Sequence, residues 1–215
     1  MTAQMFNTFD PSALVFSDMK RNASGGKTVY IKRTGGVAAL FELPELRAPF
    51  GLSSYTDTKT NKTSYSVDLS LDNTQVAEFF TNIEQRVLDT VMSHCDEYLG
   101  KTYSLDVIKS ALFKSCVRES KEPGKYAPTL KLKVLVDKNG GFIPLAYDSD
   151  RTQIPLDQIQ KGQRIRTIVD VNQIWIVDNK FGITVRLVQL MAFPMNSLPA
   201  CAFSEPDVVE DEDEE

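Results

Sequence analysis

Two long runs of alternating side chains in residues 161–193 limit the possible folds more than any other part of this sequence. In the first run one parity carries Ile165, Thr167, Val169, Val171, Trp175 and Val177. In the second run one parity carries Ile183, Val185, Leu187, Met191 and Phe193. A period of two with one apolar face predicts half-buried strands, and the short loop at 178–182 predicts an antiparallel hairpin. Such a hairpin cannot bury its apolar face alone, so the rest of the chain must supply more strands.

Further strand patterns lie on both sides of a helical block. The expected strands are 28–33, 37–43, 51–57, 62–71, 129–136 and 142–147, with breaks at Pro44 and Pro49 and a hairpin turn at 139–141. Apolar residues three and four apart predict a helix of about 25 residues from the cap Asn73 to Gly100. A second, shorter helix is expected from Ser104 to about Arg118, and one helical turn within 155–160.

This order of strands, one helical block and more strands lacks the rhythm of a parallel βαβ fold. It predicts a mainly β fold with a helical insertion, an OB-fold-like antiparallel Greek-key barrel with extra strands and a long helix. The expected organisation is an N-terminal arm at 1–26, one domain at 27–194 with its helical block at about 73–119, and a linker and tail at 195–215.

The 215 residues carry a formal net charge of −5, but the charge is unevenly distributed. Residues 203–215 contain eight acidic residues and no basic one, and Glu210, Asp211, Glu212, Asp213, Glu214 and Glu215 end the chain. Without these eight, 24 Lys and Arg stand against 21 Asp and Glu, a balance of about +3. Repulsion between like charges predicts a disordered tail, which either solubilises the chain or competes with a polyanion for its basic body.

Motifs for catalysis or metal binding do not occur in this sequence. There is no GxSxG, HExxH or triad-like grouping, and the only histidine, His94, falls within the expected long helix, which favours a structural role. Asp148 and Asp150 follow a strand, but two acids in a loop more often face water than hold a cation. The three cysteines form no CxxC pair, which fits a reducing intracellular compartment. We therefore expect no enzyme, no metal and no cofactor.

Basic residues recur two positions apart on the polar faces of the expected strands, as in Lys131 with Lys133 and Arg164 with Arg166. This spacing places each pair on one side of a sheet, where the charges can follow a phosphate backbone. Exposed aromatic rings add base stacking of roughly 1–3 kcal/mol per base. The candidate nucleic-acid-binding residues are Tyr30, Lys32, Tyr55, Lys131, Lys133, Arg164, Arg166, Trp175, Lys180, Phe181 and Arg186.

Each of these patterns has a plainer interpretation. Outward Lys and Arg also protect strand edges from aggregation. Trp175 has the parity of the core residues, so burial competes with stacking, whereas Phe181 is expected at an exposed hairpin tip.

The residues that close the expected β domain resemble those of a known family. They are 161–162, 174–176, 180–184 and 188–190. They resemble the single-stranded-DNA-binding proteins of nucleocytoplasmic large DNA viruses, OB-fold proteins similar in plan to the single-stranded-DNA-binding replication protein of short-tailed phages. The resemblance is clearest over 130–193 and implies an OB-fold, single-stranded DNA binding and an acidic tail that occupies the DNA groove or recruits replication factors. This chain lacks the terminal aromatic residue that many of those proteins have.

These observations predict a non-catalytic protein that coats and protects single strands during viral DNA replication, recombination or repair. Its expected partners are single-stranded DNA or RNA and replication proteins bound through the tail; a homodimer stays open, and no membrane is involved because no apolar run of about 18 residues occurs. The expected location is the cytoplasm or nucleus of an infected host cell, or the virion. The alternative is an acidic-tailed chaperone or scaffold for basic proteins, and a metal-dependent nuclease is a third option.

Overall fold

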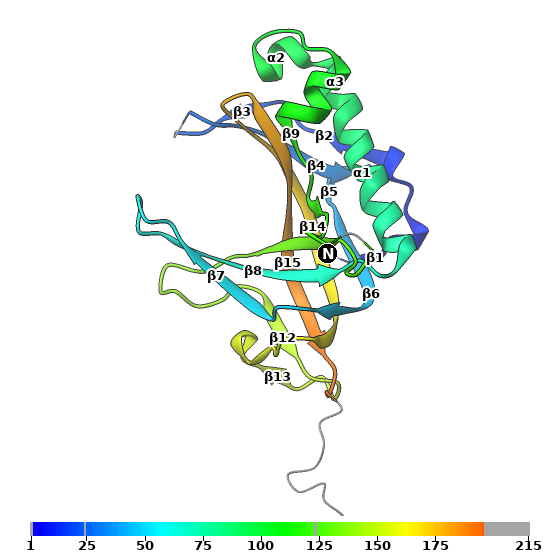
Figure 1. Cartoon of the computed structure of the whole chain (residues 1–215), viewed down its shortest axis with the longest axis vertical. Coiled ribbons are helices and arrows are strands. Elements are labelled where there is room, and N and C mark those ends of the chain that lie inside the picture. Colours follow the sequence, from blue (N-terminus) through cyan, green and yellow to red (C-terminus); the bar gives the residue numbers. More distant parts are fainter. Residues whose placement is uncertain (1, 24, 123, 196–215) are drawn as a thin grey trace, which may run out of the picture.

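The structure is a computed structural model that describes residues 2–23, 25–122 and 124–195. Within these residues the strands form one large mixed sheet, and one long helix, α1 (Thr74–Ser93), lies along one side of it (Figure 1). The mainly β fold with a helical insertion is thereby confirmed.

Five strands form a barrel: β6 (Leu40–Ala48), β8 (Thr63–Ser70), β11 (Thr129–Val134), β14 (Gln163–Val177) and β15 (Lys180–Ala192). Their order is β6, β14, β15, β11, β8, and β8 comes back beside β6. Neighbouring strands are antiparallel except β11 and β15, which run parallel. If β6, β8, β11, β14 and β15 are numbered 1 to 5 along the chain, the order around the barrel is 1-4-5-3-2, with strands 3 and 5 parallel. This is the strand order of the OB-fold. Helix α1 is inserted between strands 2 and 3 of this barrel.

Shorter elements extend the sheet. The additional strands are β1 (Gln4–Met5), β2 (Leu14–Phe16), β3 (Lys20–Arg21), β4 (Lys27–Arg33), β5 (Val37–Ala38), β7 (Leu52–Thr56), β9 (Phe113–Lys114), β10 (Val117–Arg118), β12 (Leu145–Tyr147) and β13 (Gln153–Ile154). The short helices are η1 (Phe6–Thr8), η2 (Pro11–Ala13), α2 (Cys95–Leu99), α3 (Leu105–Val107), the π-helix η3 (Ile108–Leu112) and η4 (Leu156–Gln158). Near the N-terminus, Phe6 and Leu14 are buried in the core.

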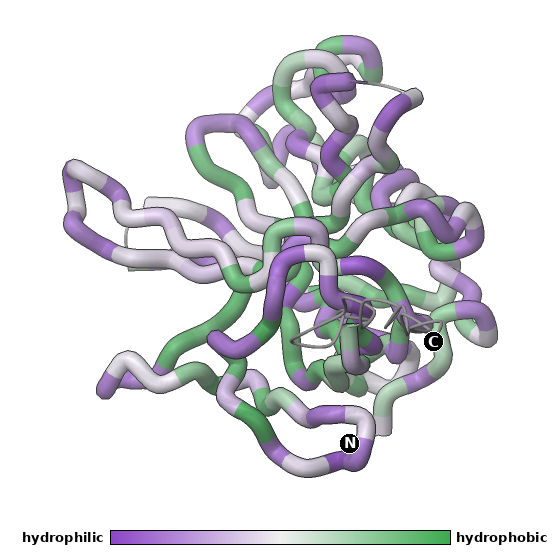
Figure 2. Tube along the Cα trace, turned by 60° about the horizontal axis from the view of Figure 1, so that its bottom comes forward, coloured by the Kyte–Doolittle hydropathy of each residue, from purple (hydrophilic) through white to green (hydrophobic). Residues whose placement is uncertain are grey.

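Helix α1 closes one side of the barrel because its apolar residues share one face. Asn73 caps it as the sequence predicts, accepting from the backbone N–H groups of Gln75 and Val76. The helix bends at His94, continues as α2 and ends at Gly100, whose φ of 82° suits glycine. Hydrophobic segments meet at the centre of the molecule, while the ends of the hairpins are hydrophilic (Figure 2).

Two β-bulges change which side chains of the β14–β15 hairpin are buried. The register shifts between Val171 and Gln173, so Ile174 and Ile176 are buried, Trp175 is half-buried and Val177 is exposed. An extra residue in β15 has the same effect. There Leu190 and Ala192 are buried, and Met191 and Phe193 are not. The parity expected for Trp175, Val177, Met191 and Phe193 is therefore wrong, because an inserted residue inverts the alternation beyond it.

Three further expectations are corrected. Pro44 does not end its strand: β6 runs through it because the register against β14 shifts between Leu43 and Leu46, and proline is tolerated at a bulge. The helix expected after Ser104 stops at Leu112, and the chain then forms β9 and β10. After the turn at 139–141 only Phe142 pairs back, in an isolated bridge, and β12 instead joins β15 in parallel.

Candidate nucleic-acid interface

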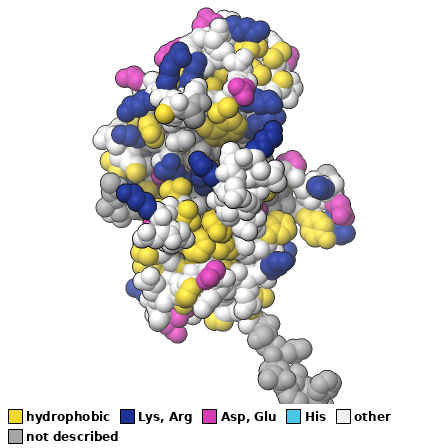
Figure 3. Space-filling view, turned by 90° about the vertical axis from the view of Figure 1, so that its left-hand side faces the viewer, with side chains coloured by type: hydrophobic (Ala, Val, Ile, Leu, Met, Phe, Trp, Pro, Cys, Tyr) yellow, Lys and Arg dark blue, Asp and Glu magenta, His cyan; other side chains and the backbone are white. Residues whose placement is uncertain are grey.

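A groove of ≈ 360 Å³ lies over the outer face of β8, β11 and β15. Four cationic side chains line it and no acidic one does: Lys114, Arg118, Lys131 and Lys133. Trp175 and Thr184 line it from the β14–β15 hairpin. On the side of the molecule away from α1, Lys and Arg side chains gather across the middle next to hydrophobic side chains (Figure 3). The groove therefore combines positive charge with two aromatic side chains, Trp175 and Tyr65.

Strand register explains why these side chains meet. In β11, Leu130, Leu132 and Val134 point into the core, so Lys131 and Lys133 point outward. Lys133 lies opposite Ser66 of β8 on one side and Arg186 of β15 on the other. Arg186 in turn lies opposite Asp170 of β14. This row of Ser66, Lys133, Arg186 and Asp170 crosses four adjacent strands.

Polar atoms on this face lack protein partners. Among the described residues, Asp68 Oδ1, Arg186 Nε and Asn172 Oδ1 are buried and accept or donate no hydrogen bond. Burial raises the pKa of Asp68, although Arg118 and Lys131 act in the opposite direction. The pKa of Asp170 is raised by burial too, against a hydrogen bond from Asn172. Buried polar atoms without partners are uncommon and mark places where a ligand can supply them.

Gly182 sets the position of the Trp175 ring. It pairs with Trp175 across the hairpin and with Lys114 of β9. A Cβ atom at position 182 would lie 2.5 Å from the Lys114 carbonyl oxygen and 2.9 Å from Cζ2 of Trp175. The absence of a side chain thus lets β9 and the indole approach β15 closely, which places Lys114 beside Trp175 in the groove.

Glu84 of α1 holds the turn between β9 and β10. Its Oε1 accepts from the backbone N–H groups of Cys116 at 2.7 Å and Val117 at 3.4 Å, and the Ser115 hydroxyl donates to it at 2.7 Å. Burial and the nearby Glu84 raise the pKa of the Cys116 thiol well above its usual value. One carboxylate therefore fixes the segment that carries Lys114 and Arg118.

Other sequence candidates lie on the same face outside the groove. Tyr55 of β7 lies opposite Ser64, with the parity of Ser66 and Lys133, and is 65% exposed. Tyr30 and Lys32 of β4 are exposed as expected, and Tyr30 lies opposite Gln173, beside the Trp175 end of the hairpin. They extend the face on either side of the groove.

Four candidates have other surroundings. Arg164 forms an ion pair with Glu45 at 3.5 Å, and Arg166 with Glu42 at 2.7 Å. The exposed ring expected at Phe181 is wrong: the hairpin turns at Asp178 and Asn179, both with positive φ, and Phe181 is fully buried against Phe113. Lys180 is exposed beside this turn. The tail from Glu210 to Glu215 lies outside the described residues.

The sequence pattern does not point to Lys114 and Arg118, because it predicts a helix over residues 104–118. The strands that carry them have two residues each and exist through pairing with β15 and β11. Phe113 and Val117, each followed by a cation, are the one local signal of strand structure there.

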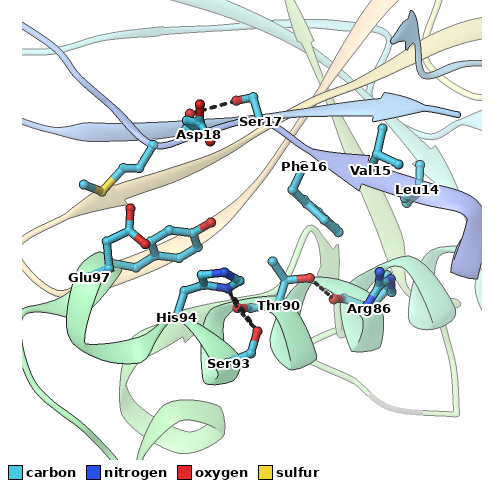
Figure 4. Close-up of a pocket in the computed structure, with 12 residues that line it drawn as sticks. Leu14, Val15, Phe16, Ser17, Asp18, Arg86, Thr90, Ser93, His94 and Glu97 are labelled. Carbon is cyan, nitrogen blue, oxygen red and sulfur yellow. Dashed lines mark hydrogen bonds between the residues drawn. The ribbon is translucent and has the colours of Figure 1, made fainter. Parts of the chain in front are cut away.

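A larger cavity of ≈ 450 Å³ lies between β2 and α1 (Figure 4). There His94 Nδ1 lies 3.0 Å from both the Thr90 carbonyl oxygen and the Ser93 hydroxyl. The imidazole also stacks on Tyr98, with ring centroids 5.2 Å apart. These contacts explain His94 as a support of the helix bend.

Two further observations concern the described part of the chain. No group of three or more His, Cys, Asp or Glu side chains there is arranged to hold a metal ion. None of the helices found in it is long and apolar enough to cross a bilayer.

The arrangement is suited to an extended polyanion that carries flat rings. Cations line the groove, a half-buried indole forms part of its wall, and an exposed tyrosine stands on the adjoining hairpin. Cations attract phosphates without regard to base sequence, and indole and phenol rings stack on any base.

Comparisons with known proteins give one family and several distant structures. The structure of gp2.5, a single-stranded DNA binding protein of bacteriophage T7, is 14% identical with a TM-score of 0.42, covering 80% of this chain and 92% of that one. The single-stranded DNA-binding protein of bacteriophage Enc34 in complex with DNA is 10% identical with a TM-score of 0.44, covering 86% and 97%. At these values the similarities say nothing about what this chain binds.

No curated protein matches the sequence. A protein-family model does match, over residues 57–202, and its description is a family of unknown function, DUF5871. Because the match spans more than half of the sequence, this chain belongs to the DUF5871 family.

Proposed function

We propose that this protein binds single-stranded DNA without catalysing a reaction on it. The observation that carries the proposal is the groove, which is lined by Lys114, Arg118, Lys131 and Lys133 together with Trp175 and by no acidic residue. A single strand has both phosphates to neutralise and unpaired bases to stack, whereas the bases of a duplex are inside it. The proposal rests on this local geometry.

Reversal of two charges tests the proposal. The double variant Lys131→Glu/Lys133→Glu is expected to weaken binding of oligo-dT and to lower the slope of log affinity against log salt by about 1.4, for two lost phosphate contacts. The matched control is Lys101→Glu/Lys109→Glu in the helical block, where neither lysine lines the groove. Equal affinity and slope for the two double variants would show that the groove does not bind DNA.

The acidic tail provides the finer part of the proposal. Residues 203–215 carry eight acidic residues, and the rest of the chain has a positive balance. We propose that the tail competes with DNA for the groove or recruits replication proteins. Deletion of 204–215 should then raise affinity at low salt and have little effect at high salt, where charges are screened. An unchanged affinity at low salt rules out competition.

The proposed setting is replication, recombination or repair of viral DNA. Its support is the resemblance of residues 130–193 to proteins of large DNA viruses. Binding assays with histones and with single-stranded RNA, run beside the DNA assay, separate this function from a chaperone for basic proteins and from an RNA-binding protein.

A further inference from the structure

A second cavity, of ≈ 320 Å³, lies over the other half of the β14–β15 hairpin. Polar side chains from five parts of the fold line it: Glu42 of β6, Tyr147 of β12, Arg166 and Thr167 of β14, Gln189 of β15, and Arg151 from the turn between β12 and β13. Two guanidinium groups around one cavity suit a phosphate, which arginine recognises through paired N–H donors.

The cavity and the groove lie on one face of the hairpin. From one end to the other the outward pairs are Arg166 with Met191, Ile168 with Gln189, Asp170 with Arg186, Gln173 with Thr184, and Trp175 with Gly182. On the side of β15 away from β14, two strands follow each other: β11 pairs with β15 at Lys133, and β12 pairs with it further along, at Tyr147. Outward residues therefore continue without interruption from the groove to the second cavity.

Arg166 is oriented by its partner and keeps donors to spare. Its Nη2 lies 2.7 Å from Glu42 Oε1, which is one contact of a side chain with five N–H donors. The remaining N–H groups are free to donate to a phosphate oxygen. The nearby carboxylate lowers the net charge of the cavity, and Arg151 restores the excess of positive charge.

Arg151 is held in an unusual backbone conformation. Its φ is 63°, a region that residues other than glycine seldom adopt. The carboxylate of Asp148 fixes the turn by accepting from the N–H groups of Asp150 at 2.9 Å and Thr152 at 2.8 Å. Within the described residues no carboxylate lies within ion-pair distance of Arg151. An exposed, unpaired arginine on a fixed turn at the mouth of a cavity is what a binding contact requires.

We propose that Arg151 and Arg166, with Tyr147 beside them, bind a second phosphodiester of the same single strand that lies in the groove. This inference rests on the proposed function and extends it to the path of the strand along β15. From Thr184 to Met191 that path is roughly 23 Å at about 3.3 Å per residue. A short oligonucleotide fills the groove alone, and a longer one reaches both sites.

Oligonucleotide length tests this path. The experiment measures affinities of the full chain and its variants for oligo-dT from about 4 to 16 nucleotides, the range bound by single OB-folds. Arg151→Gln should lower affinity for the long oligonucleotides only, by up to about fivefold. It should also lower their salt slope by about 0.7. Lys131→Gln should weaken binding at every length, and the control Lys109→Gln at none.

Equal loss at all lengths for Arg151→Gln, or no loss at any, overturns the path while leaving the groove intact. Failure of the wild-type chain to bind any length overturns the proposed function and the path with it. A second readout needs no variant. Two long oligonucleotides carry a photoreactive base, one at the 5′ end and one at the 3′ end, and only one of the two should crosslink to Tyr147. Crosslinks confined to residues of the groove would contradict the second site.

Discussion

Substitution of Gly182 by alanine offers a direct test of how the groove is built. The added Cβ would lie 2.5 Å from the Lys114 carbonyl oxygen and 2.9 Å from the Trp175 ring, so strand β9, the indole or both must move. Overpacking of this kind costs about 1–3 kcal/mol. With a slope of about 2 kcal/mol per molar urea, the unfolding midpoint should fall by about 0.5–1.5 M. Trp175 is the only tryptophan, so its emission should also change in the folded state.

Gly26 provides the matched control for this substitution. A Cβ there would meet its nearest atom, Cγ2 of Val177, at 3.4 Å, which is ordinary contact. Gly26→Ala should therefore leave stability unchanged or raise it slightly, by about 0.4–1 kcal/mol. If Gly182→Ala has the midpoint and the tryptophan emission of the wild type, the close packing of β9 on Trp175 is refuted.

Three more predictions follow from the site. Asp68→Asn should stabilise the fold and strengthen DNA binding at neutral pH. Burial raises the pKa of Asp68, so its ionised form opposes folding above that pKa. The gain in stability should vanish as the pH falls through the pKa of Asp68, as urea titrations at several pH values would show. Glu84→Ala should cost about 1–3 kcal/mol, because it leaves the Cys116 and Val117 N–H groups without a partner, and a normal urea midpoint would contradict this. Phe181→Ala should lower the free energy of unfolding by about 3–5 kcal/mol, because its ring is buried. Tyr55→Ala should leave that free energy unchanged and weaken oligo-dT binding by about 1–3 kcal/mol. The opposite pattern would contradict the assignment of Phe181 to the core and Tyr55 to the surface.

Local patterns were sufficient where a strand or helix obeys its own period. Asn73 and Gly100 bound the long helical segment as predicted, and the alternation in 129–134 placed Lys131 and Lys133 on the outer face. A barrel could be predicted from the sequence because a helical block between long strands leaves few alternative folds.

Features that depend on distant partners were not predictable. The bulge between Val171 and Gln173 is a shift in pairing with the partner strand β15, so it cannot be read from β14 alone. This bulge turns Trp175 toward the groove. Lys114 and Arg118 reach the groove because the core ring of Phe181 pairs with Phe113 and because Glu84 fixes the intervening turn. No pattern within residues 104–118 contains that information.

The most direct measurement is a titration of Trp175 fluorescence with single-stranded and double-stranded DNA. The indole lines the groove, and the chain has no other tryptophan to obscure its signal. Oligo-dT should change the emission in a saturable way that weakens with added salt, and a duplex of equal length should bind more weakly. Emission that oligo-dT leaves unaltered at low salt, at concentrations well above micromolar, would contradict a single strand in this groove.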